Sequence, residues 1–307
     1  MHADLDTLCI IVYCMAHDFL PAKARNHRRG LDDAEIVTLA VAQAIMGETY
    51  DERFLARAKK ELRHLFPKLP GRPGYWKRRR RLGEQIEALI DVFARECPGY
   101  HDSVILLDST PVECGRSRET VERSALADAC GYGYCASHSR YFWGMRMHGA
   151  FGLDGTPRGI VLWGADRPER EVAAELLPRI VCGGEAIVCD KGYAGADFEA
   201  GVAELGAVVV RPARRDEPPG GVRIAPIRQR IESIYQTLKD ILTLERHGAR
   251  TLDGLRVRIA QRLLALAACV YVNHWLGRPS RSLVAFTAQG RGTRHLGLAA
   301  ARERFAR

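Results

Sequence analysis

The 307-residue sequence has neither a membrane-spanning segment nor the start of a secretory leader. Its longest uninterrupted apolar runs, residues 8–16 and 263–272, are well short of the roughly 18 residues that a helix needs to cross a bilayer. Where a leader would begin with basic residues, the chain has Asp4 and Asp6. We therefore expect a cytoplasmic protein that does not enter a membrane.

The sequence also lacks the cysteine pattern of a disulfide framework or a zinc site. Its nine cysteines are an odd number, and no two of them are separated by two residues. Cys130, Cys135 and His138 lie close together, but no second pair of ligands follows them at a distance. Reduced thiols are the expected state.

Positive charge is concentrated in two segments. The formal net charge is +9, and residues 250–307 alone carry +9 through eleven arginines, no lysine and two acidic residues. Residues 57–81 hold eleven lysines and arginines against one acidic residue, and Tyr75 and Trp76 lie among them. Such segments attract polyanions, and the neighbouring aromatic residues favour nucleic acid over a merely solvated surface. The candidate DNA contacts in this segment are Lys77, Arg78, Arg79, Arg80 and Arg81.

Residues 1–100 have the pattern of a small helical domain. Asp32 and Asp33 can cap a helix whose apolar residues recur with helical spacing. Further helices are predicted over residues 51–66 and 76–95. Short helices with basic faces can form a helix-turn-helix that enters a DNA groove, and helix packing without DNA binding is the alternative.

Beyond residue 100 the pattern changes to alternating strands and helices. Short apolar or alternating runs predict strands, and segments with helical spacing predict helices. The strands are expected over residues 104–107, 142–153, 160–163, 186–189 and 207–210, and the helices over residues 169–180, 198–205, 226–242 and 252–276. This order predicts a mixed α/β sandwich, followed by a tail rich in glycine, arginine and serine.

Three carboxylates in three different elements are the candidates for catalysis. Asp108 and Asp190 each end a short buried strand, and Glu232 lies on a predicted helix. Carboxylates that are brought together repel one another, so a cluster needs a cation, and oxygen ligands suit Mg²⁺ or Mn²⁺. Two such ions can activate an attacking oxygen and stabilise a leaving oxygen in phosphoryl transfer. The alternative for a strand-end aspartate is an ordinary turn residue.

Basic side chains accompany these carboxylates. Arg228 lies one helical turn before Glu232 and Lys239 two turns after it, on a face where cations can hold a DNA phosphate. Lys191 directly follows Asp190 and is a further candidate for phosphate contact. Ion pairs on the helix surface are the alternative for Arg228 and Lys239.

Several short motifs follow one another in a specific order. They are the stretch at residues 62–70, Asp108-Ser109-Thr110-Pro111, Gly133-Tyr134-Cys135-Ala136-Ser137, Asp190-Lys191-Gly192-Tyr193 and Arg228-Gln229-Arg230-Ile231-Glu232. In this order they resemble the DDE transposases of bacterial insertion sequences, and among these the insertion sequence 982 family. Arg228 and Lys239 fit the spacing that related transposases have around the catalytic glutamate, whereas Ala225 stands where those enzymes often have tyrosine.

The resemblance implies both a fold and an activity. The fold is a ribonuclease H-like mixed sheet flanked by helices over residues 101–250, between a helical DNA-binding domain at residues 1–100 and a basic helix and tail at residues 251–307. Asp108, Asp190 and Glu232 are then the catalytic, metal-binding triad, and Mg²⁺ or Mn²⁺ is the cofactor. The reaction is cleavage at element ends and transfer of the 3′ hydroxyl into target DNA.

The resemblance also implies partners and a location. The partners are double-stranded DNA, as terminal repeats and as target, and further copies of the chain that form at least a dimer on DNA. The location is the bacterial cytoplasm, in association with the nucleoid.

Two other functions fit the sequence. A non-catalytic regulator derived from a transposase would bind DNA through its N-terminal domain, and truncation after about residue 100 would retain that binding. A related nuclease would cleave DNA but yield no joined products. A glycosidase with a carboxylate pair leaves the arginine-rich tail unexplained.

The triad makes a first prediction. Asp190→Ala is expected to abolish strand cleavage and to leave DNA binding measurable, because the substitution removes a metal ligand and no phosphate contact. Gel-shift and cleavage assays on the same DNA provide the test, and cleavage by the variant would contradict the triad.

Overall fold

The computed structural model describes residues 4–21, 30–135, 139–214, 217 and 224–287. The chain forms two compact units. The first, the helical unit, comprises Met1–Phe93, Thr237–Gly248 and Asp253–Arg307, and the second, the sheet unit, comprises Ala94–Gln236 and Ala249–Leu252. These units are defined by packing, so the three functional domains that the sequence suggests remain a prediction.

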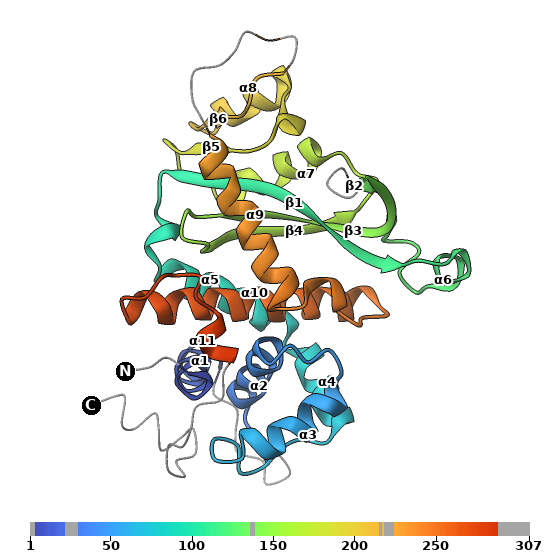
Figure 1. The fold of residues 1–307 in the computed structure, drawn as a ribbon, viewed down its shortest axis with the longest axis vertical. Helices are drawn as coiled ribbons and strands as arrows, with labels where there is room; N and C mark the ends of the chain where they lie inside the picture. The colour runs from blue at the N-terminus through green and yellow to red at the C-terminus, as the bar shows by residue number, and fades with distance from the viewer. Residues whose placement is uncertain (1–3, 22–29, 136–138, 215–216, 218–223, 288–307) are drawn as a thin grey trace. The chain divides into compact units, whose positions relative to one another are not determined.

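The helical unit consists of helices, of which the longest, α10 (Leu252–Trp275), is buried over most of its length (Figure 1). Its helices are α1 (Leu5–Phe19), α2 (Asp33–Ile45), α3 (Asp51–Glu61), α4 (Arg72–Arg81), α5 (Gly83–Arg95), α10 (Leu252–Trp275) and α11 (Val284–Thr287). The predicted cap of α2 is confirmed. Asp32 Oδ1 accepts a hydrogen bond from the Glu35 N–H at 2.7 Å, and Glu35 Oε2 accepts one from the Asp32 N–H at 2.7 Å.

The single helix predicted over residues 76–95 is wrong, because α4 ends at Arg81 and α5 begins at Gly83. Leu82, between them, has left the helical conformation with φ −93° and ψ 12°. A side chain at Gly83 would bring its Cβ within 2.8 Å of Val257 Cγ2 on α10. The break and the glycine together allow α5 to approach α10 closely.

A buried polar cluster ties α2, α3, α4 and α10 together. Asp51 accepts hydrogen bonds from Arg79 Nη1 at 2.9 Å, from Arg79 Nη2 at 3.1 Å and from Arg258 Nη2 at 2.7 Å. Gln43 Nε2 donates to the same carboxylate at 3.0 Å, and the Tyr75 hydroxyl donates to Gln43 Oε1 at 2.9 Å. The side chain of Arg79 is only 3% exposed. The cluster therefore places charges that the sequence assigns to a basic surface inside the helical unit.

The sheet unit is built on a mixed sheet that has six strands within the described residues. The strands are β1 (Val104–Gly115), β2 (Gly131–Cys135), β3 (Arg140–Phe151), β4 (Pro157–Gly164), β5 (Ala186–Val188) and β6 (Val208–Val210). Their order is β2-β3-β1-β5-β6, with β4 also paired to β3. The pairs among β1, β2, β3 and β4 are antiparallel, whereas β5 is parallel to both β1 and β6.

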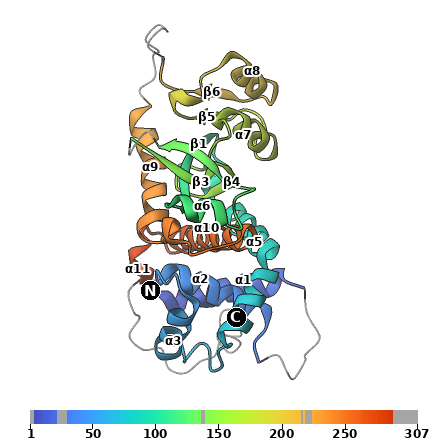
Figure 2. The same ribbon diagram turned by 90° about the vertical axis from the view of Figure 1, so that its right-hand side faces the viewer.

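Helices cover both faces of this sheet. Helices α7 (Glu169–Leu176) and α8 (Ala196–Glu204) pack against one face, and α9 (Ala225–Asp240) runs along the other (Figure 2). A short helix, α6 (Arg118–Arg123), lies between β1 and β2 in the chain. This mixed α/β architecture is consistent with a ribonuclease H-like fold and confirms the predicted fold class.

The first strand of the sheet is longer than the sequence suggests. The predicted strand ends at residue 107, whereas β1 continues through Asp108 to Gly115. Its extension pairs with β3 on one side only, because the pairing with β5 ends at Leu106. Pro111 lies in this extension, opposite Arg146 of β3, and a proline is tolerated in a strand that has a neighbour on one side only. In the sequence this proline appears to end the strand. In the structure it lies where β1 continues with β3 as its only neighbour among the described strands.

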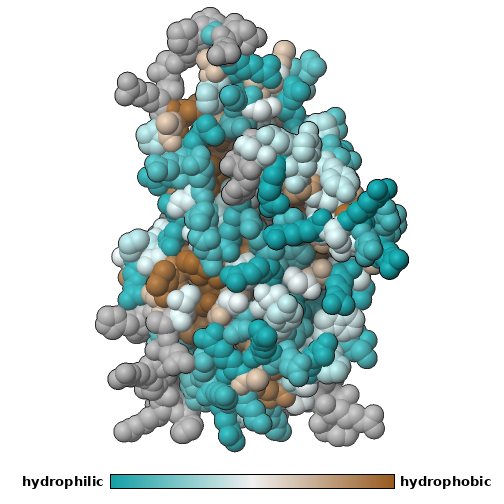
Figure 3. Space-filling view, turned by 45° about the vertical axis from the view of Figure 1, so that its right-hand side comes forward, coloured by the Kyte–Doolittle hydropathy of each residue, from teal (hydrophilic) through white to brown (hydrophobic). Residues whose placement is uncertain are grey.

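The described part of the chain contains no helix that is both long and apolar enough to cross a membrane. The face of the molecule in Figure 3 is predominantly hydrophilic, with local hydrophobic areas between charged and polar side chains.

The buried cluster makes a stability prediction. Asp51→Ala leaves Arg79 and Arg258 without their counterion, and the expected loss is about 3–5 kcal/mol of unfolding free energy. The matched control is Asp253→Ala, which breaks an ion pair of 2.6 Å with the exposed Arg80 and is expected to cost about 1 kcal/mol or less. Urea unfolding followed by circular dichroism measures both. Equal losses would show that the buried cluster contributes no more than a surface pair.

Candidate active site

Asp108 lies on β1, and Asp190 follows the neighbouring parallel strand β5 in the chain. The β1–β5 ladder ends with Leu106 opposite Val188, and each aspartate comes two residues further along. Asp190 caps the turn Lys191–Tyr193, where its Oδ1 atom accepts a hydrogen bond from the Gly192 N–H at 2.7 Å. Its negative charge lies near enough to raise the pKa of Asp108. The fold thus brings these two predicted residues together.

The environment of Asp108 favours its uncharged form. Burial raises the pKa of Asp108 to about 7, and the negative charges of Asp190 and Glu169 act in the same direction. The Ser109 N–H donates to Asp108 Oδ1 at 2.8 Å, and the positive charge of Arg228 also opposes the increase. A carboxyl group in this state gains most from a nearby cation.

Helix α9 is attached to the strand that carries Asp108. The Tyr235 hydroxyl donates to the Asp108 carbonyl oxygen at 2.6 Å, and its ring packs edge-on against Phe151 at a centroid distance of 5.8 Å. Arg228 lies near enough for its charge to lower the pKa of Asp108. Glu232, one turn after Arg228, has an exposed side chain. The helix therefore holds Arg228 near Asp108, while Glu232 stays exposed one turn further along.

No three histidine, cysteine, aspartate or glutamate side chains of the described residues are grouped closely enough to hold a metal ion. Glu232 is therefore not part of a preassembled cluster with Asp108 and Asp190. Lys191, next to Asp190, is exposed. Lys239 forms an ion pair with Glu245, whose Oε1 lies 3.3 Å from the Lys239 Nζ atom.

Glu169 also lies at this site, although no pattern in the sequence distinguishes it. It is the first residue of α7, and its Oε1 atom accepts hydrogen bonds from Ser109 Oγ at 2.5 Å and from Arg146 Nη1 at 2.7 Å. Arg146 Nη2 in turn donates to the Tyr134 carbonyl oxygen at 2.6 Å. An acidic residue in the first turn of a helix is a common stabilising feature, so the sequence could not distinguish this glutamate from an ordinary one.

Two further groups near the site are buried and have no hydrogen-bond partner among the described residues. They are the hydroxyl of Tyr193, in the turn after Asp190, and both ring nitrogens of His148 on β3. Burial, followed by the charges of Arg146 and Arg167, lowers the pKa of His148 to about 4. His148 is therefore a neutral interior residue.

The basic run of α4 is only partly available to a ligand. Lys77, Arg80 and Arg81 are exposed, whereas Arg78 is partly buried and donates to Asp33 Oδ1 at 2.6 Å. The prediction that Arg79 contacts DNA is wrong, because its guanidinium is buried against Asp51. An arginine run on a helix must turn one of its members inward, and the sequence does not show which one.

A sequence profile of the family described as "Transposase DDE domain" matches residues 99–268, more than half of the chain. The chain belongs to this family of DDE transposases. The matched stretch contains Asp108, Asp190 and Glu232. No curated protein and no solved structure matches the chain significantly.

The raised pKa of Asp108 makes a prediction about stability and pH. The folded pKa of about 7 lies above the ordinary value of 3.8, so ionisation opposes folding. In the metal-free protein, the contribution of Asp108 to stability is expected to fall as pH rises from about 4 to about 7. Asp108→Asn removes this loss and is expected to raise the melting temperature at pH 8 but not at pH 4.

Thermal unfolding in EDTA across this pH range measures the difference between variant and wild type. Asp128→Asn, at an exposed aspartate, is the control and is expected to follow the wild type at every pH. If the melting temperature of Asp108→Asn followed that of the wild type at every pH, the pKa of Asp108 would not be raised in the folded protein, and the prediction would be wrong.

Proposed function

We propose that the chain is an active DNA transposase that uses divalent metal ions to cut the ends of an insertion element and to join them to target DNA. The observation that carries this proposal is the proximity of Asp108, on β1, to Asp190, which directly follows the neighbouring parallel strand β5, within the stretch that matches the transposase domain. Membership of the insertion sequence 982 family is part of the same proposal and is supported by the order of the short motifs.

The donor set fits Mg²⁺ or Mn²⁺. Asp108 and Asp190 supply only oxygen atoms, and their mutual repulsion is reduced when a cation binds between them. Mg²⁺ in such sites binds to one or two carboxylates and completes its coordination with water and substrate phosphates. The pair therefore suffices as an anchor, and we propose Glu232 as the third ligand because α9 places it one turn beyond Arg228. When bound, the ions stabilise charge on the attacking and leaving oxygens.

The remaining residues of the site act on DNA and on the carboxylates. Arg228 and Lys191 can bind phosphates of the strand that lies against the aspartate pair, since both lie next to these carboxylates. Tyr235 holds α9 against β1 through the Asp108 carbonyl oxygen. In cleavage, a water oxygen forms a bond to phosphorus and the 3′ oxygen of the element leaves. In joining, that 3′ oxygen attacks a phosphorus of the target and displaces the target's own 3′ oxygen.

The partners follow from this reaction. Double-stranded DNA, as terminal repeats and as target, would contact the exposed basic residues of α4, namely Lys77, Arg80 and Arg81, with the partly buried Arg78 beside them. Transposition brings two element ends together, so we propose at least a dimer on DNA, in the bacterial cytoplasm at the nucleoid. Lys239 is paired with Glu245, as Arg78 is with Asp33 and Arg80 with Asp253, so each of these side chains would exchange a carboxylate for a phosphate on binding DNA.

The test is cleavage and strand joining on a duplex that carries the terminal repeats flanking the gene. Metal-dependent joined products are expected with Mg²⁺, and none with EDTA or with Glu232→Ala. Asp240→Ala, at another exposed acidic residue of α9, is the matched control and is expected to retain activity. DNA binding without cleavage in Mg²⁺ or Mn²⁺ would indicate a regulator, and cleavage without joining would indicate a nuclease.

A further inference from the structure

A row of aromatic side chains lies on the β2–β3 hairpin, away from the carboxylates. Tyr132 pairs with Trp143 and Tyr134 with Tyr141 across the two antiparallel strands. Cross-strand partners and residues two apart project on the same face, so all four rings share one face of the sheet. Tyr132, Tyr134 and Tyr141 are 59%, 46% and 75% exposed. Aromatic residues gathered in this way on a surface indicate contact with a ligand.

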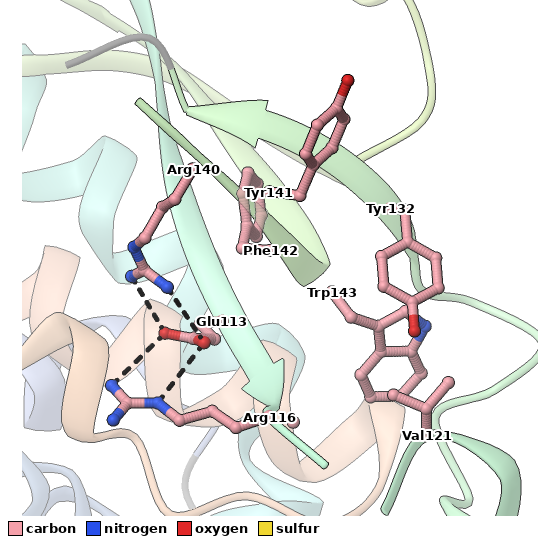
Figure 4. A pocket seen from close by; sticks show the side chains of 9 residues that line it. Glu113, Arg116, Val121, Tyr132, Arg140, Tyr141, Phe142 and Trp143 are labelled. Carbon is pink, nitrogen blue, oxygen red and sulfur yellow. Dashed lines mark hydrogen bonds and ion pairs between the residues drawn. The ribbon is translucent and has the colours of Figure 1, made fainter. Parts of the chain in front are cut away.

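A cavity of about 410 Å³ opens beside this row (Figure 4). Tyr132 and Trp143 lie together on one side of it with Val121, which α6 supplies. Gly115 leaves room at this wall, because a Cβ there would lie 3.1 Å from the Trp143 ring. The residues at this side of the cavity are therefore flat and largely apolar.

The opposite side of the cavity carries two arginines that converge on one carboxylate. Arg140 donates to both oxygens of Glu113 at 3.2 and 3.1 Å, and Arg116 approaches the same carboxylate at 3.4 Å (Figure 4). Glu113 is largely buried, whereas the Arg116 side chain is 83% exposed. Glu113 thus orients the guanidinium groups without matching their combined charge.

We propose that this cavity binds an unpaired nucleotide of a DNA strand, whose base stacks on the exposed ring of Tyr132 and whose phosphate contacts Arg116 and Arg140. The Trp143 ring, which is 4% exposed, supports this wall of the cavity from within. Aromatic side chains with arginine at their border are the usual means of holding single-stranded nucleic acid, because every base has a flat face and every nucleotide a phosphate. A base inside a duplex is already stacked, so an unpaired base is the one that can enter. This site rests on the proposed action on DNA.

The register of the sheet connects this cavity to the carboxylates. Asp108 pairs with Gly149 on β3, and Trp143 lies six residues further along the same strand. Residues opposite one another project on the same face, so Asp108 and the aromatic row lie on one face of the sheet, about 20 Å apart along β3. This length corresponds to about six stacked nucleotides. A strand held at Asp108 therefore reaches the cavity within a few nucleotides of the bond that is cut.

A peptide is the other occupant that the surface suggests, because β2 lies at the edge of the sheet. A peptide that extends the sheet binds through backbone groups at the edge. The cavity is instead lined by aromatic rings and guanidinium groups, which are side chains and not the backbone groups of a strand edge. This arrangement favours the nucleotide.

The experiment compares the affinity of the full chain for two probes by fluorescence anisotropy at one salt concentration. One probe is a blunt 25-base-pair duplex. The other is the same duplex with a single-stranded overhang of six dT nucleotides, prepared once as a 3′ overhang and once as a 5′ overhang. The wild type is expected to bind one tailed duplex about 10-fold more tightly than the blunt one. Tyr132→Ala is expected to remove this preference and to leave the affinity for the blunt duplex unchanged.

Two matched variants keep the result specific. Tyr132→Phe retains the ring and is expected to retain the preference. Tyr50→Ala removes an equally exposed tyrosine that also lies beside an arginine, Arg53, but belongs to the helical unit, and it is expected to leave the preference intact. A 2-aminopurine placed in the extension reports stacking directly, since its fluorescence is quenched on the wild type and recovers with Tyr132→Ala.

Each other outcome overturns a stated claim. Equal binding of blunt and tailed duplexes by the wild type, or an unchanged preference in Tyr132→Ala, would overturn the nucleotide site and favour a peptide as occupant. Failure of the wild type to bind any of these duplexes would overturn the proposed action on DNA itself.

Discussion

Burial of the Asp108 carboxyl group is the constraint on which the candidate site depends. Burial raises the pKa of Asp108, and the negative charge of Asp190, just after the neighbouring strand, adds to this effect. The surrounding contacts hold the strands in place nonetheless. The Ser109 N–H donates to the Asp108 carboxylate, and the Tyr235 hydroxyl donates to the Asp108 carbonyl oxygen. A site that is costly without a cation and held from both sides is suited to bind one when substrate arrives.

The distribution of arginine shows how charge counted along a sequence differs from charge available at a surface. Arg79 belongs to the first basic segment, and Arg258 and Arg262 belong to the second. All three are buried, where Asp51 pairs with the first two and the carbonyl oxygens of Thr243 and Arg258 accept hydrogen bonds from the third. Buried arginines fix the packing of α10 against its neighbours. Among the described residues, the exposed basic surface is therefore smaller than the count of arginines in these segments suggests.

Local patterns predicted local structure well. Short-range spacing in the sequence was enough to predict the cap of α2 and the mixed order of strands and helices. It also predicted that Arg228 and Glu232 lie on one helix. Three features depended on tertiary contacts and could not be predicted in this way. The break before Gly83 depends on the approach of Val257, the extension of β1 depends on its pairing with β3, and the position of Glu169 depends on how α7 meets Ser109.

Glu169 and Arg146 connect the carboxylate pair to the hairpin that carries the aromatic row. Glu169 binds Ser109, the residue after Asp108, and Arg146 joins Glu169 to the backbone of Tyr134 on β2. Because Tyr134 and Tyr132 lie on the same short strand, the orientation of this hairpin is fixed by the same side chains that support β1 at the carboxylates. A DNA strand that contacts both places would thus meet a single continuous framework of hydrogen bonds. Such a framework keeps the distance between the reacting bond and the bound base constant, which is a condition for cutting at a defined position.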